Sequence, residues 1–397
     1  MLFKRKPVAI PDKYETPFLL AWRRLRKNKL ALAGLSFIGL SFMVAMLGYL
    51  ITPDSTPNAN YMSPEVALQG PGFKQQFLLV KKQDAVEKEN IWTRMITGEE
   101  PLFNSIPITG YQFVEEQIMV NLFRGEGVAQ KMIAYDIRTV VKGVVDTTLQ
   151  LSEATIKSLQ LQIVEHQLIT KKFMLGTDTY GRDILSRLLI GVRVSLAVGF
   201  MAVIISLLIG TFLGAIAGYY QGRVDDAIMW IINIVWAIPT LLLVFAITLA
   251  LGKGFWQIFV AVGLTMWVQV ARIVRGQVMS IRAMEYVEAA KSLGFRDARI
   301  IFRHVLPNTI GPVLVVAASN FATAILVEAG LSFLGIGVQP PVPSWGSMIK
   351  ENYGFIISSN PMLALAPGIA IMLMVLAFNL LGNGLRDALD VKTKTER

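Results

Sequence analysis

The chain alternates between long apolar runs and polar stretches, and the apolar runs are long enough to cross a membrane. A hydrocarbon layer about 30 Å thick is spanned by roughly 20 apolar residues in an α-helix. Six runs in this sequence have about that length or more: Leu30–Ile51, Leu188–Ala217, Ala227–Leu251, Phe255–Ile273, Thr309–Leu331 and Leu363–Leu385. The pattern predicts an α-helical polytopic membrane protein with about six transmembrane helices.

A long polar segment, residues 52–175, separates the first two predicted spans. It contains two β-favourable runs with partial alternation, Phe73–Lys82 and Ile106–Phe123, which are bounded by glycines at Gly70–Gly72 and Gly125–Gly127. Apolar residues in Ser152–Ile169 have near-helical spacing and predict an amphipathic helix. These signals predict a small α+β insertion between the first two transmembrane helices, and no catalytic constellation is visible in it.

Lysine and arginine are concentrated beside particular ends of the spans, and this distribution predicts the orientation. They precede the first span (Arg23, Arg24, Arg26, Lys27, Lys29), follow the fourth (Arg272, Arg275, Arg282, Lys291, Arg296, Arg299, Arg303) and follow the sixth (Arg386, Lys392, Lys394, Arg397). Short cytoplasmic segments carry such an excess, whereas long loops translocate largely regardless of charge. We therefore expect cytoplasmic N- and C-termini and an extracytoplasmic, or periplasmic, insertion.

This orientation divides the chain into four parts. Residues 1–29 form a basic cytoplasmic segment, residues 30–51 form the first transmembrane helix, and residues 52–175 form the insertion. Residues 176–397 form a core with five further transmembrane helices and a cytoplasmic loop at 285–308.

Composition excludes several other classes of protein. The chain is 53% hydrophobic and 17% charged, whereas soluble domains carry roughly 25% charged residues. The net charge of +10 lies beside the apolar spans, as membrane topology requires, so nucleic acid is not an expected partner and the lipid bilayer is. There is no cysteine, and the two histidines, His166 and His304, are far apart, so a metal centre is not expected.

The cytoplasmic loop after the fourth span has the pattern of two helices joined at a glycine. Glu285–Leu293 predicts a helix, Gly294 is suited to the left-handed conformation that ends one, and Asp297 can start a second helix that stops near Pro307. One interpretation is a compact knob that seats in a partner's cleft, with alanines that permit close approach and with Glu288 and Arg296 fixing its register. An ordinary amphipathic hairpin on the membrane surface is the alternative.

Several motifs in this chain resemble one transporter family. Glu288-Ala289-Ala290, then Gly294, then Leu306-Pro307 is similar to the EAA loop of bacterial ABC importer permeases, although His304 replaces the apolar residue usual at its position. Leu175–Arg187, Glu328–Gly337, Gln339-Pro-Pro and Pro343-Ser-Trp-Gly346 resemble stretches of the C-type permease half in the dipeptide/oligopeptide/nickel branch. The resemblance covers residues 18–51 and 173–391, and it does not extend to most of the insertion.

The resemblance implies function and partners. It implies a bacterial inner-membrane permease subunit that forms half of a pathway for di- or oligopeptides, or a related small solute. The expected partners are ABC ATPase subunits docked on the EAA loop, a homologous second permease and an extracytoplasmic solute-binding protein. The sequence contains no GxxxxGK[ST] phosphate loop, so we expect no cofactor and no enzymatic activity in this chain, with ATP bound and hydrolysed by a partner.

Two other classes of function are open alternatives. An ion-coupled secondary carrier would act without an ATPase, but such carriers have repeated halves and midplane binding sites, and the predicted spans show no repeat and no clear buried carboxylate. A membrane-bound enzyme or sensor would have its working part in residues 52–175. The absence of a catalytic cluster there argues against it.

Polar and special residues within or beside the spans are the remaining candidates for function. Glu328 is placed at the outer gate or in interfacial water, with interfacial water favoured, and Asn320 and Gln269 are possible pathway residues that more often form interhelical hydrogen bonds. Pro239 predicts a kink, and Gly210, Gly214 and Gly218 predict a close helix contact. Thr177 or Asp178 is expected to cap a helix lying along the outer interface, with Arg182 and Arg187 towards lipid headgroups or a substrate-delivery protein.

Overall fold

The structure is a computed structural model in which residues 17–83, 90–125, 131–143, 151–252, 254–357 and 360–389 are described. Five of its helices are long and apolar enough to cross a membrane: α2 (Lys29–Ile51), α6 (Ile184–Tyr220), α9 (Phe255–Arg282), a helix that runs from Asp297 to Phe333 and includes α12 (Leu306–Phe333), and α14 (Met362–Leu389). A sixth span exists if the bent pair α7 (Gly222–Ala237) and α8 (Thr240–Leu251) is counted as one. The predicted helical membrane fold is confirmed.

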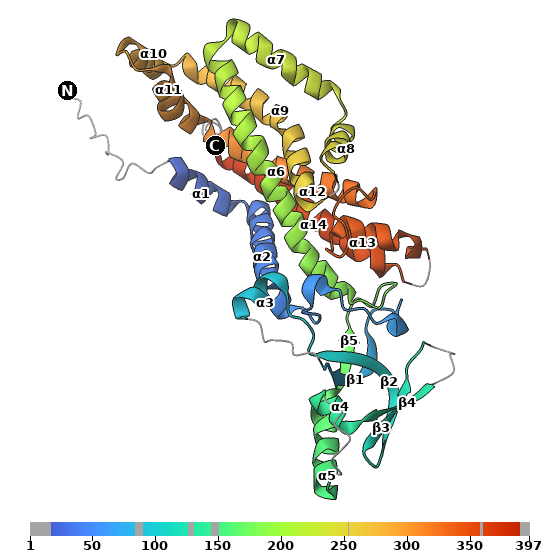
Figure 1. Ribbon diagram of the computed structural model, residues 1–397. Coiled ribbons are helices and arrows are strands. Elements are labelled where there is room, and N and C mark those ends of the chain that lie inside the picture. The colour runs from blue at the N-terminus through green and yellow to red at the C-terminus, as the bar shows by residue number, and fades with distance from the viewer. Residues whose placement is uncertain are drawn as a thin grey trace, which may run out of the picture.

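The helices form an elongated bundle with a separate unit at one end (Figure 1). The sheet of the insertion lies at the lower end of the view, and α10 (Glu285–Ser292) and α11 (Asp297–Ile300) lie at the upper end. Short α1 (Pro17–Lys27) packs against the last turns of α14, where Leu25, Ala31 and Ala388 form a small core. The insertion and the α10–α11 projection therefore lie at opposite ends of the transmembrane helices.

Helices α6 and α9 pack closely because glycines face the contact. A Cβ atom added at Gly214 would lie 2.5 Å from the carbonyl oxygen of Ala271, and one at Gly218 would lie 2.6 Å from that of Arg275. Gly210 meets α9 in the same way, at the carbonyl oxygen of Trp267. The close helix contact predicted from the spacing of these glycines is confirmed, because only a residue without a side chain leaves room for the facing backbone.

The third predicted span is broken rather than kinked. Helices α7 and α8 meet at an angle of 93° around Ile238 and Pro239. Pro239 has no N–H to continue the ladder, and it holds Ile238 in the extended conformation at φ −89° and ψ 128°. The sequence predicted a kink at Pro239 within one continuous helix. This prediction is wrong, because the chain instead changes direction by 93° between two separate helices.

The insertion contains a five-stranded antiparallel sheet in the order β4-β3-β2-β1-β5. Its strands are β1 (Phe73–Lys81), β2 (Phe103–Val114), β3 (Gln117–Leu122), β4 (Lys131–Asp136) and β5 (Leu168–Phe173). Helices α4 (Ile137–Lys142) and α5 (Glu153–Gln162) pack on the sheet around buried Leu78, Ile118 and Val140, and α3 (Ile91–Thr97) contacts α2. The two β-favourable runs therefore supply β1, β2 and β3.

One prediction for the insertion is wrong in its extent. The helix expected over Ser152–Ile169 ends at Gln162, continues as a π-helical turn over Ile163–Gln167, and is followed by β5. Leu168 and Ile169 instead pair with Leu78 and Phe77 of β1, because strand pairing removes their backbone groups from water as well as their side chains. Gly127, expected to bound a strand, lies outside the described residues, as do the terminal basic residues Lys392, Lys394 and Arg397.

Candidate functional site

The projection formed by α10 and α11 turns sharply at one glycine. Helix α10 carries Glu285 and Glu288 in its first turn, where acidic side chains interact favourably with the helix dipole. Gly294 follows α10 with φ +76°, a conformation that costs any residue with a side chain, while the space around its Cα is open. The constraint at Gly294 is therefore conformational rather than steric, as the sequence predicted.

Apolar contacts and one hydrogen bond hold the projection on the bundle. Val287 and Ala290 are buried against α6 and α9, together with Ile300, Ile301 and Val305. The Tyr219 hydroxyl at the end of α6 donates a 2.7 Å hydrogen bond to Asp297 of α11. A load applied to the projection is consequently carried into α6, α9 and α12.

The outer face of the projection is exposed and mixed in chemistry. Glu288 and Ala289 are exposed, while Leu293 and Phe302 are 74% and 65% exposed. The two alanines that the sequence treated alike have different surroundings, since Ala289 faces outward and Ala290 packs against the bundle. Of the candidate coupling residues, Glu288, Ala289, Gly294 and Pro307 are thus accessible to a partner.

The end of the motif differs from the sequence prediction. Leu306 is half-buried beside the projection's core, and Pro307 is exposed in the first turn of α12. The second helix does not stop near Pro307, because a π-helical turn over Ile301–Val305 continues directly into α12. Proline is tolerated in a first turn, where its missing N–H would have no intrahelical partner.

The three candidate pathway residues do not form one site. Gln269 lines a cavity of about 340 Å³ beside the α7–α8 break, together with Thr240, Thr265 and Thr323. Asn320 is 1% exposed within α12, and neither polar atom of its side chain has a hydrogen-bond partner among the described residues. Gln269 is therefore the candidate that the structure brings next to other polar groups on an accessible surface.

Glu328 is fully buried, which corrects two expectations. Its carboxylate accepts a 2.7 Å hydrogen bond from Ser332 and does not reach interfacial water from within the subunit. The spans therefore do contain a buried carboxylate, contrary to the expectation from the sequence, so the absence of one does not distinguish this protein from a carrier. Helix α13 (Trp345–Asn352) covers this end of α12: Gly346 packs directly on Ala329 and Ser332.

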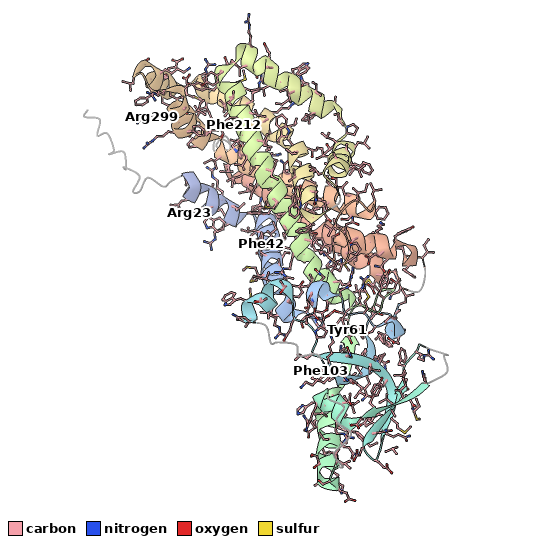
Figure 2. All side chains as sticks on the ribbon, viewed as in Figure 1. Arg23, Phe42, Tyr61, Phe103, Phe212 and Arg299 are labelled. Carbon is pink, nitrogen blue, oxygen red and sulfur yellow. The ribbon has the colours of Figure 1, made fainter. Side chains whose placement is uncertain are left out.

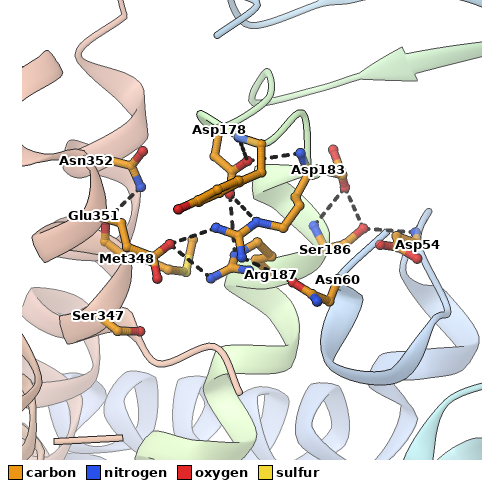
Figure 3. Close-up of polar contacts among 12 residues, drawn as sticks. Asp54, Asn60, Asp178, Asp183, Ser186, Arg187, Ser347, Met348, Glu351 and Asn352 are labelled. Atoms are coloured by element: carbon orange, nitrogen blue, oxygen red, sulfur yellow. Dashed lines mark hydrogen bonds and ion pairs between the residues drawn. The ribbon is translucent and has the colours of Figure 1, made fainter. Parts of the chain in front are cut away.

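A buried ion-pair cluster joins α6, α13 and the segment after α2 at the insertion end of the bundle (Figure 3). Arg182 donates to Asp178 at 2.6 Å, to Glu351 at 2.8 Å and to Asn60 at 3.1 Å. Arg187 contacts Glu351 at 3.4 Å. In this outer cluster the side chains of Asp178, Arg182 and Arg187 are at most 4% exposed and are shielded from water, whereas that of Glu351 is 24% exposed.

The outer cluster contradicts the placement of Arg182 and Arg187 towards lipid headgroups. Asp183, and not Thr177 or Asp178, caps α6 by accepting hydrogen bonds from Ser186. Asp178 and Arg182 are four residues apart, but they lie in the turn that precedes α6, so no helical spacing predicts this pair. Glu351 lies 169 residues from Arg182, and no local pattern predicts that contact.

The fold and these sites define a class: a multi-pass helical membrane protein with a helix–glycine–helix projection at one end and a folded insertion at the other. Comparison with known families specifies it further. Residues 210–395 match the family described as binding-protein-dependent transport system inner membrane component, and residues 16–71 match the N-terminal transmembrane domain of oligopeptide transport permease C.

Two permease proteins of known sequence give the same assignment. The chain is 44% identical over 221 residues, 56% of its length, to 73% of a glutathione transport system permease protein from Pectobacterium atrosepticum. It is 47% identical over 220 residues, 55% of its length, to 72% of a dipeptide transport system permease protein from Alkalihalophilus pseudofirmus. The MetNI methionine ABC transporter, solved in an inward-facing form, is similar at 18% identity and TM-score 0.43, over 51% of this chain and 96% of that one.

This chain belongs to the family of inner-membrane components of binding-protein-dependent transport systems. It is a permease subunit of an ABC importer and a multi-pass membrane protein, and the comparisons support this function over that of an ion-coupled carrier. The two family matches leave residues 72–209 uncovered, which include the sheet of the insertion.

Proposed function

We propose that this permease forms half of a translocation pathway for di- or oligopeptides, or a related small solute, driven through the α10–α11 projection by a separate ATPase subunit. The names of the relatives, which transport dipeptides and glutathione, support a peptide-like solute. The observation that carries the coupling role is the two-sidedness of the projection. One side, with Val287 and Ala290, is buried against α6 and α9, and the other, with Glu288 and Ala289, is exposed.

The mechanism that we infer is mechanical. Closure of two ATPase subunits on nucleotide displaces the projections, and α6, α9 and α12 move with them because their side chains share one core with the projection. A partner shifts a two-state equilibrium only by binding the two states with different free energies, and nucleotide-driven closure is a source of that difference. The chain itself binds no nucleotide and hydrolyses none in this proposal.

The remaining partners follow from the family and from the two ends of the bundle. A homologous second permease completes the pathway. An extracytoplasmic solute-binding protein delivers the solute at the insertion end. The N- and C-termini are cytoplasmic in this orientation, because α1 and the end of α14 lie at the end that carries the projection.

Reversing the charge at Glu288 tests the coupling role. In the reconstituted importer, Glu288→Arg is expected to abolish most solute uptake and weaken co-purification of the ATPase, while membrane insertion is unchanged. Glu165→Arg is the matched control, because Glu165 is an exposed glutamate on the insertion, at the other end of the molecule. Normal uptake and ATPase association in Glu288→Arg, or an equal loss in the control, would refute the proposal.

A further inference from the structure

A cavity of about 460 Å³ lies where the sheet of the insertion meets the start of α6. Its walls come from β1, β2 and β5, from the segment that follows α2, and from Gly181 and Asp183 before α6. Tyr61 and Phe103, which both line it, lie at the junction between the sheet and the bundle (Figure 2). Ligand sites for small molecules are commonly about 300–1,000 Å³, so the cavity has the size of a binding site.

Lys171 presents an ammonium group with unused donors to this cavity. Its Nζ donates to the Ser105 hydroxyl at 3.1 Å and lies 5.1 Å and 5.0 Å from the ring centres of Tyr61 and Phe77. An ammonium has three N–H donors, and Ser105 supplies the one hydrogen-bond acceptor found for it in the described part of the chain. Burial lowers the pKa of Lys171, and the charges of Asp54 and Asp183 act in the opposite direction.

Asp183 lines the same cavity and has a buried carboxylate oxygen that accepts no hydrogen bond from a described residue. It is 4% exposed, and its Oδ2 accepts from the backbone N–H and the hydroxyl of Ser186 (Figure 3). Its Oδ1 has no partner among the residues that the structure describes. Burial raises the pKa of Asp183, against the hydrogen bonds from Ser186. Asp54, also in the wall, accepts one backbone N–H on each oxygen, from Thr56 and Tyr61, and retains acceptor capacity.

The two signs of charge select the class of ligand. The ionisable groups of the wall are four carboxylates and two lysines: Asp54, Glu99, Glu100, Asp183, Lys171 and Lys172. This balance disfavours a simple anion, and no group of three metal-ligating side chains was found in the described ranges. A ligand that carries both a carboxylate and an ammonium satisfies Lys171 and Asp183 together, and Phe77, Leu79 and Phe103 offer it an apolar wall.

We propose that this cavity binds a zwitterionic amino acid or short peptide, with the ligand carboxylate on Lys171 and the ligand ammonium on Asp183 and Asp54. Lys171 and Asp183 lie between the two family matches, whereas Asp54 lies within the match to residues 16–71. The site is separate from the coupling projection. Binding there requires no ATPase and no transport cycle. The proposal therefore stands or fails independently of the coupling role.

The test is calorimetric titration of the full chain in lipid nanodiscs, without partner subunits, with L-alanyl-L-alanine as the probe. N-acetyl-alanyl-alanine lacks the ammonium and alanyl-alanine amide lacks the carboxylate. Each is expected to bind at least about tenfold more weakly, because a charge-assisted hydrogen bond is lost at one end of the ligand. Equal binding of the free and blocked dipeptides, or no binding of the free one, would overturn the proposal.

Two lysines of the sheet supply a matched pair of variants. Lys171→Gln is expected to weaken binding of the free dipeptide at least about tenfold and to leave the amide unaffected, since the amide has no carboxylate to lose. Lys74→Gln, which removes an exposed lysine of β1 that does not line the cavity, is expected to change affinity about fivefold or less. Equal effects of the two variants would contradict the assignment. If Lys171→Gln does not fold, the blocked dipeptides still decide the question on the unaltered protein.

Discussion

Replacement of Asp178 by asparagine probes the outer cluster most directly. The substitution keeps the shape of the side chain but removes the charge that faces Arg182 at 2.6 Å and Arg187 at 3.9 Å. Oδ1 of Asp178 accepts the backbone N–H groups of Tyr180 and Arg182, so the new amide group must replace Oδ2 and point its own donors at Arg182. Two buried guanidinium groups are then left with Glu351, whose side chain is 24% exposed.

The burial of the pair sets the expected loss of unfolding free energy in Asp178→Asn. Removing one partner of a buried ion pair costs about 3–5 kcal/mol, because the remaining charge stays buried without compensation. Asp178 and Arg182 side chains are 1% and 4% exposed, so water screens the pair little and that range applies. A more accessible, half-buried pair gives the control: Arg94 and Glu99 lie 3.0 Å apart with side chains 41% and 21% exposed. Glu99→Gln is expected to cost less than about 1 kcal/mol.

The assay is a double-mutant cycle with Asp178→Asn, Arg182→Gln and the double variant. Unfolding in mixed micelles is followed by circular dichroism and by tryptophan fluorescence. Trp345 is a suitable reporter because its indole N–H donates a hydrogen bond to the carbonyl of Leu188, next to Arg187. Each single variant is expected to be strongly destabilised and the double variant to lose much less than their sum. Single effects that add to within about 0.5 kcal/mol would show that the two residues are uncoupled and would refute the reasoning.

Three further predictions test other parts of the structure. Gly214→Ala places a Cβ atom 2.5 Å from the carbonyl oxygen of Ala271 and is expected to cost about 1–3 kcal/mol of unfolding free energy. Gly276→Ala, at a position with open space around it, is expected to be neutral or stabilising. Equal stabilities of the two variants would exclude the close contact. Gly294→Val forces a β-branched residue into the left-handed conformation at φ +76°, which costs about 1–2 kcal/mol or more of conformational free energy. The variant is expected to abolish coupled uptake without affecting membrane insertion. Normal uptake would be the contrary result. The hydrogen bond from Arg138 lowers the pKa of Asp136, so the ionised carboxylate stabilises the insertion at pH values above the ordinary pKa of 3.8, and this stabilisation is lost as pH falls through the lowered pKa. Hydrogen exchange across residues 131–142 measures the difference in stability between the unaltered chain and Asp136→Asn, and this difference should shrink in acid. A difference that stays constant with pH would contradict the prediction.

Features of the fold that depend on local chemistry could be predicted from the sequence alone. Span lengths depend on runs of apolar residues against a fixed bilayer thickness, so the long helices could be predicted. The turn at Gly294 depends on the conformational range of one residue, and the close approach of α6 and α9 depends on glycines spaced along one helix face. Each of these signals lies within a short stretch of sequence, where the residue types directly determine the local geometry.

Other features were decided only by residues that are distant in the sequence. Ala289 and Ala290 are chemically alike, and α6 and α9 determine which of them is buried. The burial of Glu328 depends on α13, whose Gly346 packs on Ala329 and Ser332 at that end of α12.

The charged groups show the limit most clearly. Arg182 contacts Glu351 across 169 residues of sequence. Lys171 and Asp183 share a cavity because the segment that follows β5 leads directly to the start of α6. A sequence shows which charges a chain carries and where hydrocarbon excludes them. Whether a charge is buried and paired is set by the tertiary structure, because the electrostatic free energy depends on separations of a few ångströms and on the exclusion of water.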